Sequence, residues 1–219
     1  MSKPSLILIG AGGHANACID VIEQHGQYRI AGLVGTQAEM HAQHYDYRVI
    51  ATDSDLPELA KLHQYAFIAV GQVQSPDVRI RLYQQATKFA FQLPAIVAPT
   101  AHVSRHARVG AGTIVMHGAI INAGASVGIN CIINTRALVE HDAKVEDHCH
   151  ISTGALINGG ARIGAGSFVG SGSIVKEGVR LGECCVVGMG LSVRHDQPDR
   201  ARFMGNDKAS QTERGGPAD

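Results

Sequence analysis

The chain has 219 residues, enough for one large or two small domains that each bury a hydrophobic core. Its 19 Lys and Arg balance its 19 Asp and Glu, which excludes an overall field that would attract nucleic acid or an anionic membrane. The five Cys have irregular spacing and the start, MSKPSLILIG, is too short an apolar run for a signal peptide or a membrane span, so we expect a cytoplasmic protein without disulfides or membrane insertion.

The first part of the chain alternates between strand and helix patterns. We predict strands in SLILI (5–9), RIAGLVG (29–35) and AFIAVG (66–71), with a helix over 15–26 after the first strand. The apolar residues of this helix recur at helical spacing, at Ala15, Cys18, Ile19 and Ile22. This alternation predicts a small Rossmann-like α/β domain with a parallel sheet over residues 1–95.

A further helix is predicted after the third strand. Ser75 is a suitable N-cap, and Pro76 is suited to the first helical position because it needs no amide hydrogen there. The residues expected on the buried face of this helix are Val78, Leu82, Ala86 and Phe89.

The turn after the first strand, GAGGHA, has the spacing of a dinucleotide-binding fingerprint. Gly10, Gly12 and Ala15 would let backbone amides and a helix N-terminus face a pyrophosphate. An NAD site also needs an acidic residue at the end of the second strand, and here that strand ends GLVGT. NAD is therefore disfavoured, and two alternatives stay open: a nucleotide pyrophosphate site, or a turn that only joins strand to helix.

The second part of the chain is a repeat of six residues. From Val97 to Ser192, sixteen consecutive hexads begin with Val, Ile or Leu, and the fifth position is nearly always small. This period predicts a parallel β-helix over residues 96–193 with three hexads in a coil of 18 residues. Positions one and five should point inward, including Cys131, Cys149 and Cys185. The tail, 194–219, loses the repeat, and we expect its last residues, SQTERGGPAD, to be disordered.

The stretch VEHDAKVEDHCHIS (139–152) concentrates titratable residues within this repeat. Its histidines, His141, His148 and His150, occupy hexad positions three, four and six, so none is predicted to point inward. A zinc site is disfavoured because Cys149 would point away from the histidines, and no metal is expected. His148 is interpreted as a solvated side chain.

His141 is the candidate base. It lies between Glu140 and Asp142, and a carboxylate beside an imidazole fixes the tautomer and raises the basicity of the ring. His150 follows nine residues later, which is half a coil and therefore another face of the prism. The two histidines could meet only across a subunit boundary, which favours a threefold oligomer with shared sites.

The opening LILIGAGGH, followed by a hexapeptide repeat with NTRALVEHD and HCHIS, resembles the sugar O- and N-acyltransferases of bacterial glycan synthesis. It is most similar to the UDP-4-amino-sugar N-acetyltransferases of bacillosamine-type pathways, and sialic acid O-acetyltransferases are relatives. The resemblance implies a left-handed β-helix, a homotrimer, acetyl-CoA as co-substrate and a UDP-amino sugar as acceptor. It implies that His141 is the general base, Asp142 orients it and His150 contacts the acetyl group.

The remaining binding residues follow from the same comparison and from the repeat. The nucleotide-sugar set is Gly10, Gly12, Gly13, His14, Gly71 and Asn134. The residues expected to form the wall for acetyl-CoA, 18 residues apart in pairs, are Gly170, Ser171, Gly188 and Met189. Two other functions stay open: O-acetylation of a sialic acid type of sugar, and nucleotide-sugar binding without catalysis. A covalent acyl-cysteine is set aside because three of the cysteines are predicted to point inward.

Overall fold

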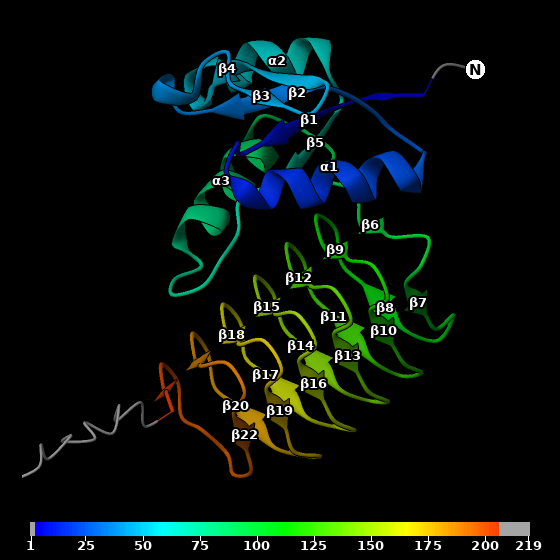
Figure 1. Cartoon of the computed structure of the whole chain (residues 1–219), viewed down its shortest axis with the longest axis vertical. Coiled ribbons are helices and arrows are strands. Elements are labelled where there is room, and N and C mark those ends of the chain that lie inside the picture. Colours follow the sequence, from blue (N-terminus) through cyan, green and yellow to red (C-terminus); the bar gives the residue numbers. More distant parts are fainter. Residues whose placement is uncertain (1–2, 206–219) are drawn as a thin grey trace, which may run out of the picture.

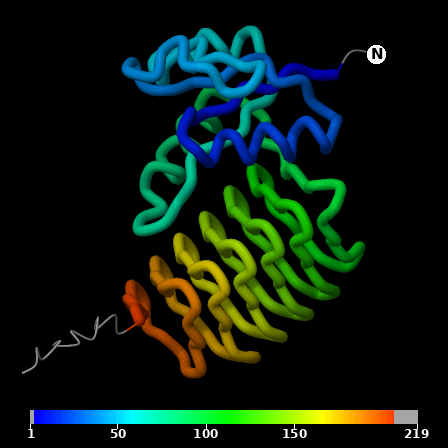
Figure 2. Tube along the Cα trace, viewed as in Figure 1, coloured from blue at the N-terminus to red at the C-terminus, as the bar shows by residue number. Residues whose placement is uncertain are grey.

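The computed structural model describes residues 3–205, so the expected disorder of 210–219 lies outside the described residues. The chain forms two parts (Figure 1). A small α/β domain, drawn in blue to teal, lies above a three-sided prism of short strands, drawn in green to orange. Figure 2 shows the coils of this prism stacked one after another, with the chain passing from the first part into the second once. None of the described helices is long and apolar enough to span a bilayer.

The α/β domain contains a five-stranded sheet in the order β3-β4-β2-β1-β5. Every neighbouring pair is parallel except β3 and β4, an antiparallel pair at the edge. The predicted parallel sheet is therefore present, with one short antiparallel addition. The elements are β1 (Ser5–Ile9), α1 (Gly13–His25), β2 (Arg29–Gly35), β3 (Gln43–His44), β4 (Tyr47–Thr52), α2 (Leu56–Leu62), β5 (Tyr65–Ile68) and α3 (Asp77–Lys88), with short 3-10 turns at Gln37–Glu39 and Asp53–Asp55.

The two sides of this sheet have different partners. Leu6 and Leu8 of β1 pack in a core that includes α1 and residues of the prism, such as Ile132. Ile7 and Ile9 point to the other side, toward α2 and α3. Because side chains alternate along a strand, β1 joins both cores, and α1 is held between the sheet and the prism.

Helix α3 differs from its prediction in two ways. It begins at Asp77 with Pro76 as its N-cap, one residue later than predicted, and the Ser75 hydroxyl accepts from the Asp77 backbone amide just outside the helix. Val78 is 50% exposed, and Arg79 is buried in its place. The helix is turned because its inner side contacts the prism as well as the sheet; Leu82 and Ala86 are buried as predicted.

The prism has three parallel sheets, here called faces 1, 2 and 3 in the order in which the chain meets them. Face 1 contains β6 (Ile96–Val97), β9 (Ile114–Val115), β12 (Ile132–Ile133), β15 (His150–Ile151), β18 (Phe168–Val169), β21 (Val186–Val187) and β23 (Arg202–Phe203). Face 2 contains β7 (His102–Val103), β10 (Ile120–Ile121), β13 (Leu138–Val139), β16 (Leu156–Ile157), β19 (Ile174–Val175) and β22 (Ser192–Val193). Face 3 contains β8 (Arg108–Val109), β11 (Ser126–Val127), β14 (Lys144–Val145), β17 (Arg162–Ile163) and β20 (Arg180–Leu181).

The interior of the prism follows the hexad frame. Strands 18 residues apart are paired, as in Ile132 with His150, so one coil takes three hexads. The aliphatic first residues and the small fifth residues form a single buried core. Cys131, Cys149 and Cys185 lie within it, as predicted. The coil also continues past residue 193, because β23 pairs with β21 even though the hexad has been lost from the sequence.

Candidate active site

His141 and Asp142 lie in the turn between faces 2 and 3, here called the 2–3 corner. His141 Nδ1 lies 3.1 Å from Asp142 Oδ2, and the His141 backbone amide donates to Glu140 Oε2 at 3.1 Å. Asn122 donates to the same Glu140 oxygen from the preceding coil. The His141 side chain is 67% exposed. With Nδ1–H donating to Asp142, the Nε2 atom keeps a free lone pair, as a base requires.

Two glycines in the neighbouring coils make room for this pair. A Cβ atom on Gly159 would lie 2.6 Å from His141 Nε2, and a Cβ on Gly124 would lie 2.3 Å from Asp142 Oδ1. Asp142 itself has a φ of 58°, a left-handed conformation that Asp tolerates better than most residues. The coil above and the coil below therefore lack side chains where the imidazole and the carboxylate need space.

His150 lies on face 1 and points outward from the prism, as its hexad position predicted, but it is buried. The α/β domain covers it: Nδ1 donates to the backbone carbonyl of Gln72, in the loop after β5. The Asn134 side-chain amide lies 3.2 Å from Nε2, and the Phe168 ring packs edge-on at 5.2 Å. Burial lowers the pKa of His150 to about 4, so the ring is neutral at neutral pH.

His14 lies close to this group from the first turn of α1. Its Cβ faces Gly71, where an added Cβ would lie 3.5 Å away. Its Nε2 atom is buried and has no hydrogen-bond partner. Burial is the main cause that lowers the pKa of His14 to about 3, with the nearby charge of Arg79 as a second cause. The structure thus brings His14, Gly71 and His150 together under the α/β domain, with Asn134 next to His150.

His148 is not the solvated side chain that was predicted. Its ring packs edge-on against Tyr83 of α3, and its Nδ1 accepts from the Asn130 side chain at 3.0 Å. The half-buried ring helps to attach α3 to the corner between faces 3 and 1, here the 3–1 corner. The reason for the difference is that α3 covers this corner, which the hexad pattern alone does not indicate.

The predicted acetyl-CoA wall lies at the 1–2 corner, between faces 1 and 2, on the same edge as Asn134. Ser171 is exposed and its hydroxyl contacts that of Ser152 at 2.9 Å, while Met189 is 80% exposed. Gly170 is small for another reason than the one predicted. A Cβ on Gly170 would lie 2.6 Å from the backbone of Gly188, so its missing side chain serves the stacking of coils rather than the approach of a ligand.

A cleft of about 270 Å³ opens at the carboxyl ends of the parallel strands, where nucleotides bind in α/β sheets. Gly10 and Gly12 form one side of it, and Arg81 lines it from α3. Gly13 lies outside this cleft, in a shallow hollow along α1. Gly10 has a φ of 119° and no space for a side chain, because a Cβ would lie 2.5 Å from Val70. Gly10 is therefore required by the packing against Val70, whereas a Cβ on Gly12 would meet nothing within 4 Å.

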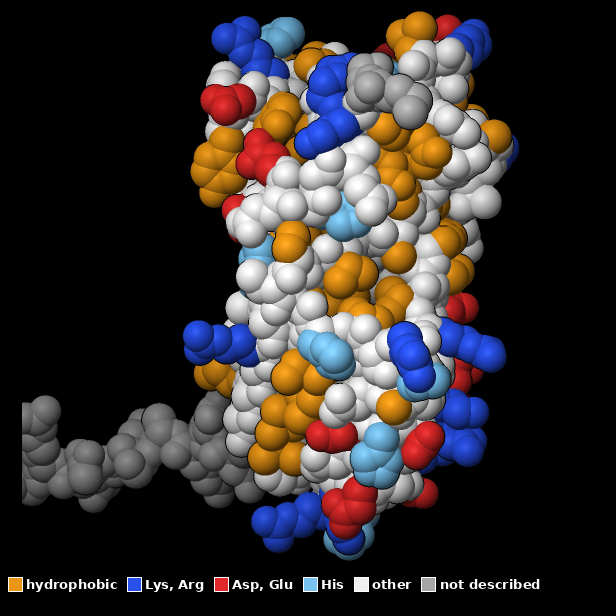
Figure 3. All heavy atoms as spheres, turned by 90° about the vertical axis from the view of Figure 1, so that its right-hand side faces the viewer, with side chains coloured by type: hydrophobic (Ala, Val, Ile, Leu, Met, Phe, Trp, Pro, Cys, Tyr) orange, Lys and Arg blue, Asp and Glu red, His pale blue; other side chains and the backbone are white. Residues whose placement is uncertain are grey.

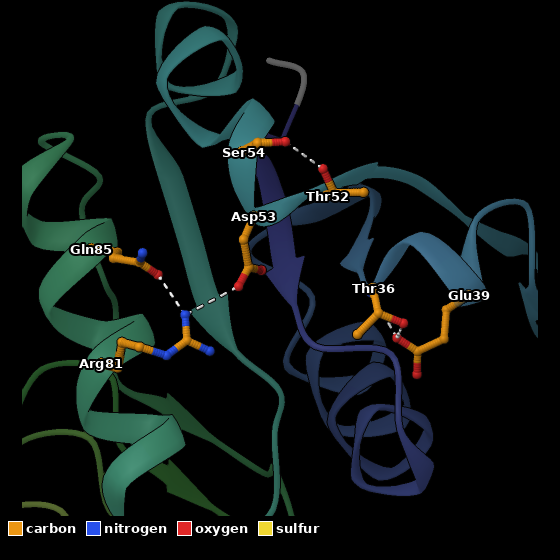
Figure 4. A network of polar contacts seen from close by, with 7 residues as sticks. All are labelled: Thr36, Glu39, Thr52, Asp53, Ser54, Arg81 and Gln85. Atoms are coloured by element: carbon orange, nitrogen blue, oxygen red, sulfur yellow. Dashed lines mark hydrogen bonds and ion pairs between the residues drawn. The ribbon is translucent and has the colours of Figure 1, made fainter.

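Two carboxylates line this cleft although the second strand ends without one (Figure 4). Glu39 accepts from the backbone amide and hydroxyl of Thr36, which lowers the pKa of its carboxyl. Asp53 accepts from Arg81 at 3.3 Å. The sequence contained a signal for Glu39, since TQAE is a helix-capping pattern that returns the acid to the end of β2.

Known proteins that are similar to this chain identify its family. The profile of the PglD N-terminal domain matches residues 5–86. A histidine-to-asparagine variant of perosamine N-acetyltransferase from Caulobacter crescentus, in complex with CoA and GDP-perosamine, is 31% identical, covers 93% of this chain and 95% of its own, and superposes with a TM-score of 0.87. PerB from the same organism, also in complex with CoA and GDP-perosamine, is 32% identical, covers 93% of this chain and 95% of its own, and superposes with a TM-score of 0.86.

A third similar structure is the acetyltransferase domain of PglB from Neisseria gonorrhoeae FA1090 in complex with acetyl coenzyme A. It is 30% identical, covers 94% of this chain and 98% of its own, and has a TM-score of 0.85. A comparison with curated protein sequences gives no significant match.

The chain belongs to the sugar acyltransferases with hexapeptide repeats. Membership confirms the predicted fold, a small α/β domain followed by a left-handed parallel β-helix, and makes the chain an acetyl-CoA-dependent acetyltransferase.

This acyltransferase has a second hollow that the sequence did not indicate. A cavity of about 400 Å³ on face 2 is lined by Lys176 and Arg194, together with Asn158 and Ile174. Lys176 and Arg194 follow β19 and β22 at the 2–3 corner, two and three coils after His141 at the same corner. The two cations were missed because single basic residues in a repeat give no distinctive pattern.

Within residues 3–205, no three His, Cys, Asp or Glu side chains form a group that could hold a metal ion. His141 and His150 lie on different sides of the prism, and Cys149 points into its core.

Proposed function

We propose that this acyltransferase moves the acetyl group of acetyl-CoA to the amine of a nucleotide-linked 4-amino sugar, with UDP as the nucleotide expected from the sequence. The observation that carries the proposal is the exposed His141–Asp142 pair, whose Nε2 atom is free. The similar C. crescentus enzyme was solved with GDP-perosamine, so GDP is the alternative nucleotide to be tested.

The chemistry assigned to His141 is general-base catalysis without an acyl-enzyme. The amine nitrogen attacks the thioester carbonyl while Nε2 accepts the proton that the nitrogen loses. The C–N bond forms, the C–S bond then breaks, and the CoA thiolate takes the proton back from the imidazolium. Asp142 stabilises this imidazolium through Nδ1–H, and backbone amides of the coils stabilise the oxyanion.

The acceptor is assigned to the α/β domain and the adjoining edge of the prism. Gly10 and Gly12 would hold the nucleotide in the cleft at the end of the sheet. The buried, unpaired Nε2 of His14 and the amide of Asn134 lie where the α/β domain meets the prism. They would contact the sugar and its phosphates there. His150 uses both ring nitrogens within the chain, so its contact with the acetyl group would be through the ring edge.

The site requires two chains. His141 lies at the 2–3 corner and His150 lies on face 1, next to the 1–2 corner, so one chain cannot bring both to one substrate. The outward residues of face 2 form an apolar stripe between these corners: Ile120, Leu138, Leu156 and Ile174. Figure 3 shows hydrophobic side chains gathered between charged ones on a flank of the molecule. We therefore propose a homotrimer in which face 2 packs against the neighbouring chain.

Acetyl-CoA would lie in the groove between two such prisms. Ser171 and Met189 would form its wall on one chain, and Lys176 and Arg194 of the neighbour would face its phosphates. Ammonium and guanidinium groups are suited to phosphate binding. Because acetyl-CoA and nucleotide sugars are made in the cytoplasm, we place the reaction there.

The test is an assay of the full chain with acetyl-CoA and with matched UDP- and GDP-linked 4-amino and 4-hydroxy sugars. The expected product is an amide, formed only from an amino sugar and stable to mild base. A base-labile ester, formed from the hydroxy sugar, would replace N-acetylation with O-acetylation. Tight binding of the nucleotide sugar without any acetyl transfer would overturn the enzymatic assignment.

A further inference from the structure

Arg79 of α3 is a buried cation at the junction of the two parts of the chain. It is 1% exposed and lies between the sheet, α1 and the 3–1 corner of the prism. Burial lowers the pKa of its guanidinium to about 10, so the group is still charged at neutral pH. A buried charge is costly unless it is well paired, so its presence here needs a reason.

The partners of Arg79 are carbonyl oxygens. One terminal nitrogen donates to the backbone carbonyls of Ile68 and Val70, at the end of β5. The other donates to the backbone carbonyl of Asn130 at 3.1 Å and to its side-chain oxygen at 2.8 Å. No carboxylate in the described part of the chain forms an ion pair with it. The positive charge is therefore held in place without being neutralised.

These hydrogen bonds join the two elements that enclose His150. The segment that starts at Ile68 and Val70 continues directly to Gln72, whose carbonyl accepts from His150 Nδ1. Asn130 precedes β12, the strand paired with His150. The guanidinium thus fixes the end of β5 against the coil beside the one that carries His150.

The hydrogen bonds around His150 admit one arrangement of protons. The Asn134 side-chain oxygen accepts from the backbone amide of Thr135 at 2.7 Å, so its NH₂ group must point to His150 Nε2. Nε2 then accepts, and Nδ1 carries the hydrogen that goes to Gln72. A proton on Nε2 would oppose the NH₂ group of Asn134 and displace it.

We propose that Arg79 is a positioning residue: a buried cation without a carboxylate partner that fixes Gln72 over His150, so that the ring and Asn134 stay oriented in the acceptor site. The role of Asn134 in this statement rests on the proposed function. The geometry and the charge of Arg79 do not depend on the proposed function.

The charged and titratable groups around His150 support this role. Burial is the largest cause that lowers the pKa of His150, the Gln72 carbonyl raises it, and the charge of Arg79, from α3, makes the smallest contribution and lowers it, in the same direction as burial. His14 faces His150 from α1 and is itself neutral, because burial and, to a smaller extent, the charge of Arg79 lower its pKa as well. The strand neighbours Ile132 and Phe168 carry no charge. Removal of the Arg79 charge should therefore make His150 easier to protonate.

The test follows the ring signals of His150 by NMR during a pH titration of the unliganded full chain. Arg79→Met, which removes the charge, should raise the midpoint of His150, by less than burial lowers it, because burial is the larger cause. Arg79→Lys keeps the charge but loses the two separate donor nitrogens of the guanidinium. It should leave the midpoint of His150 near that of the wild type. Asn130→Asp places a carboxylate on the guanidinium and should raise the midpoint even if Arg79→Met does not fold.

The outcomes are distinct from those of the activity assay. A midpoint that is unchanged in Arg79→Met or Asn130→Asp overturns the proposal, and so does an equal rise in Arg79→Lys, which would indicate opening of the site to water. If acetyl transfer occurs, the acid limb of kcat/KM should move with the midpoint. If the chain does not catalyse acetyl transfer at all, the titration still decides the role of Arg79.

Discussion

The 2–3 corner at His141 and the centre of face 1 at His150 use the same side chain in opposite environments. Both come from one repeat, half a coil apart, but only face 1 is covered by the α/β domain. His141 is exposed and paired with a carboxylate, whereas His150 is buried among neutral groups and under the influence of the Arg79 guanidinium. The repeat supplies positions, and the element packed over each position decides whether its histidine can accept a proton.

The largest expected effect is on catalysis at the exposed histidine. His141→Ala should lower kcat by about 10²- to 10⁴-fold, because a general base contributes that much to a transfer of this kind. Thermal stability should change little, since the side chain is exposed. Steady-state kinetics with the acceptor found in the assay above would measure the effect.

The matched control is His106→Ala, an exposed histidine at the same corner two coils earlier. It should keep the kcat of the wild type. If His141→Ala also dissociated the oligomer, or if both variants lost activity alike, the corner would have a structural role instead of a catalytic one.

Stability should depend on pH through the buried His150. The folded pKa of His150, about 4, lies below its ordinary value of 6.5, so the unfolded chain binds more protons between these values. The stability that comes from the neutral ring is therefore present above pH 6.5 and is lost as the pH falls toward 4, by about 3 kcal/mol. His14 should act in the same direction.

Urea unfolding at pH 7 and pH 5 would measure this slope. His150→Asn should show a smaller loss of stability between the two pH values than the wild type, and His141→Ala should show the same loss. An unchanged slope in His150→Asn would mean that His150 is not held neutral in the folded chain.

Two glycine substitutions should separate coil stacking from the space around the base. Gly170→Ala places a Cβ 2.6 Å from the backbone of Gly188 and should cost about 1–3 kcal/mol of stability. Gly159→Ala meets only the movable ring of His141, so it should lower kcat and leave the melting temperature nearly unchanged. Melting curves and kinetics would be measured on both variants, and an unchanged kcat in Gly159→Ala would contradict the role of His141 as the base.

The smallest expected effect is that of metal removal. Dialysis against a chelator should leave activity unchanged, because the histidines of the 139–152 stretch lie on different sides of the prism. Stoichiometric zinc in protein purified without added metal, with activity lost on chelation, would contradict this interpretation.

The interior of the β-helix could be predicted residue by residue, because position in the hexad alone decides what points inward. Burial on the outer surface could not be predicted in this way. His148 and His150 are covered by Tyr83 and Gln72, which are distant in the sequence. The buried Arg79 gave no signal either, since an arginine on a helix is usually exposed.

The two carboxylates of the nucleotide cleft could be predicted only in part from the sequence. Glu39 could have been found from its capping pattern with Thr36, whereas Asp53 reaches the cleft only because β4 lies beside β2 in the folded sheet. The stretch that carries His141 and Asp142 was recognisable because their contact is local, between adjacent residues.

The most direct test of the shared site is complementation between two inactive chains. His141→Ala and His150→Ala chains would be co-expressed with different tags, and trimers that carry both tags would be purified. Each mixed trimer should contain one interface with both histidines, so about one third of the wild-type activity should return. If both parents are inactive and the mixed trimers show no activity, the two histidines serve a site within one chain, and the account of a site between subunits is wrong.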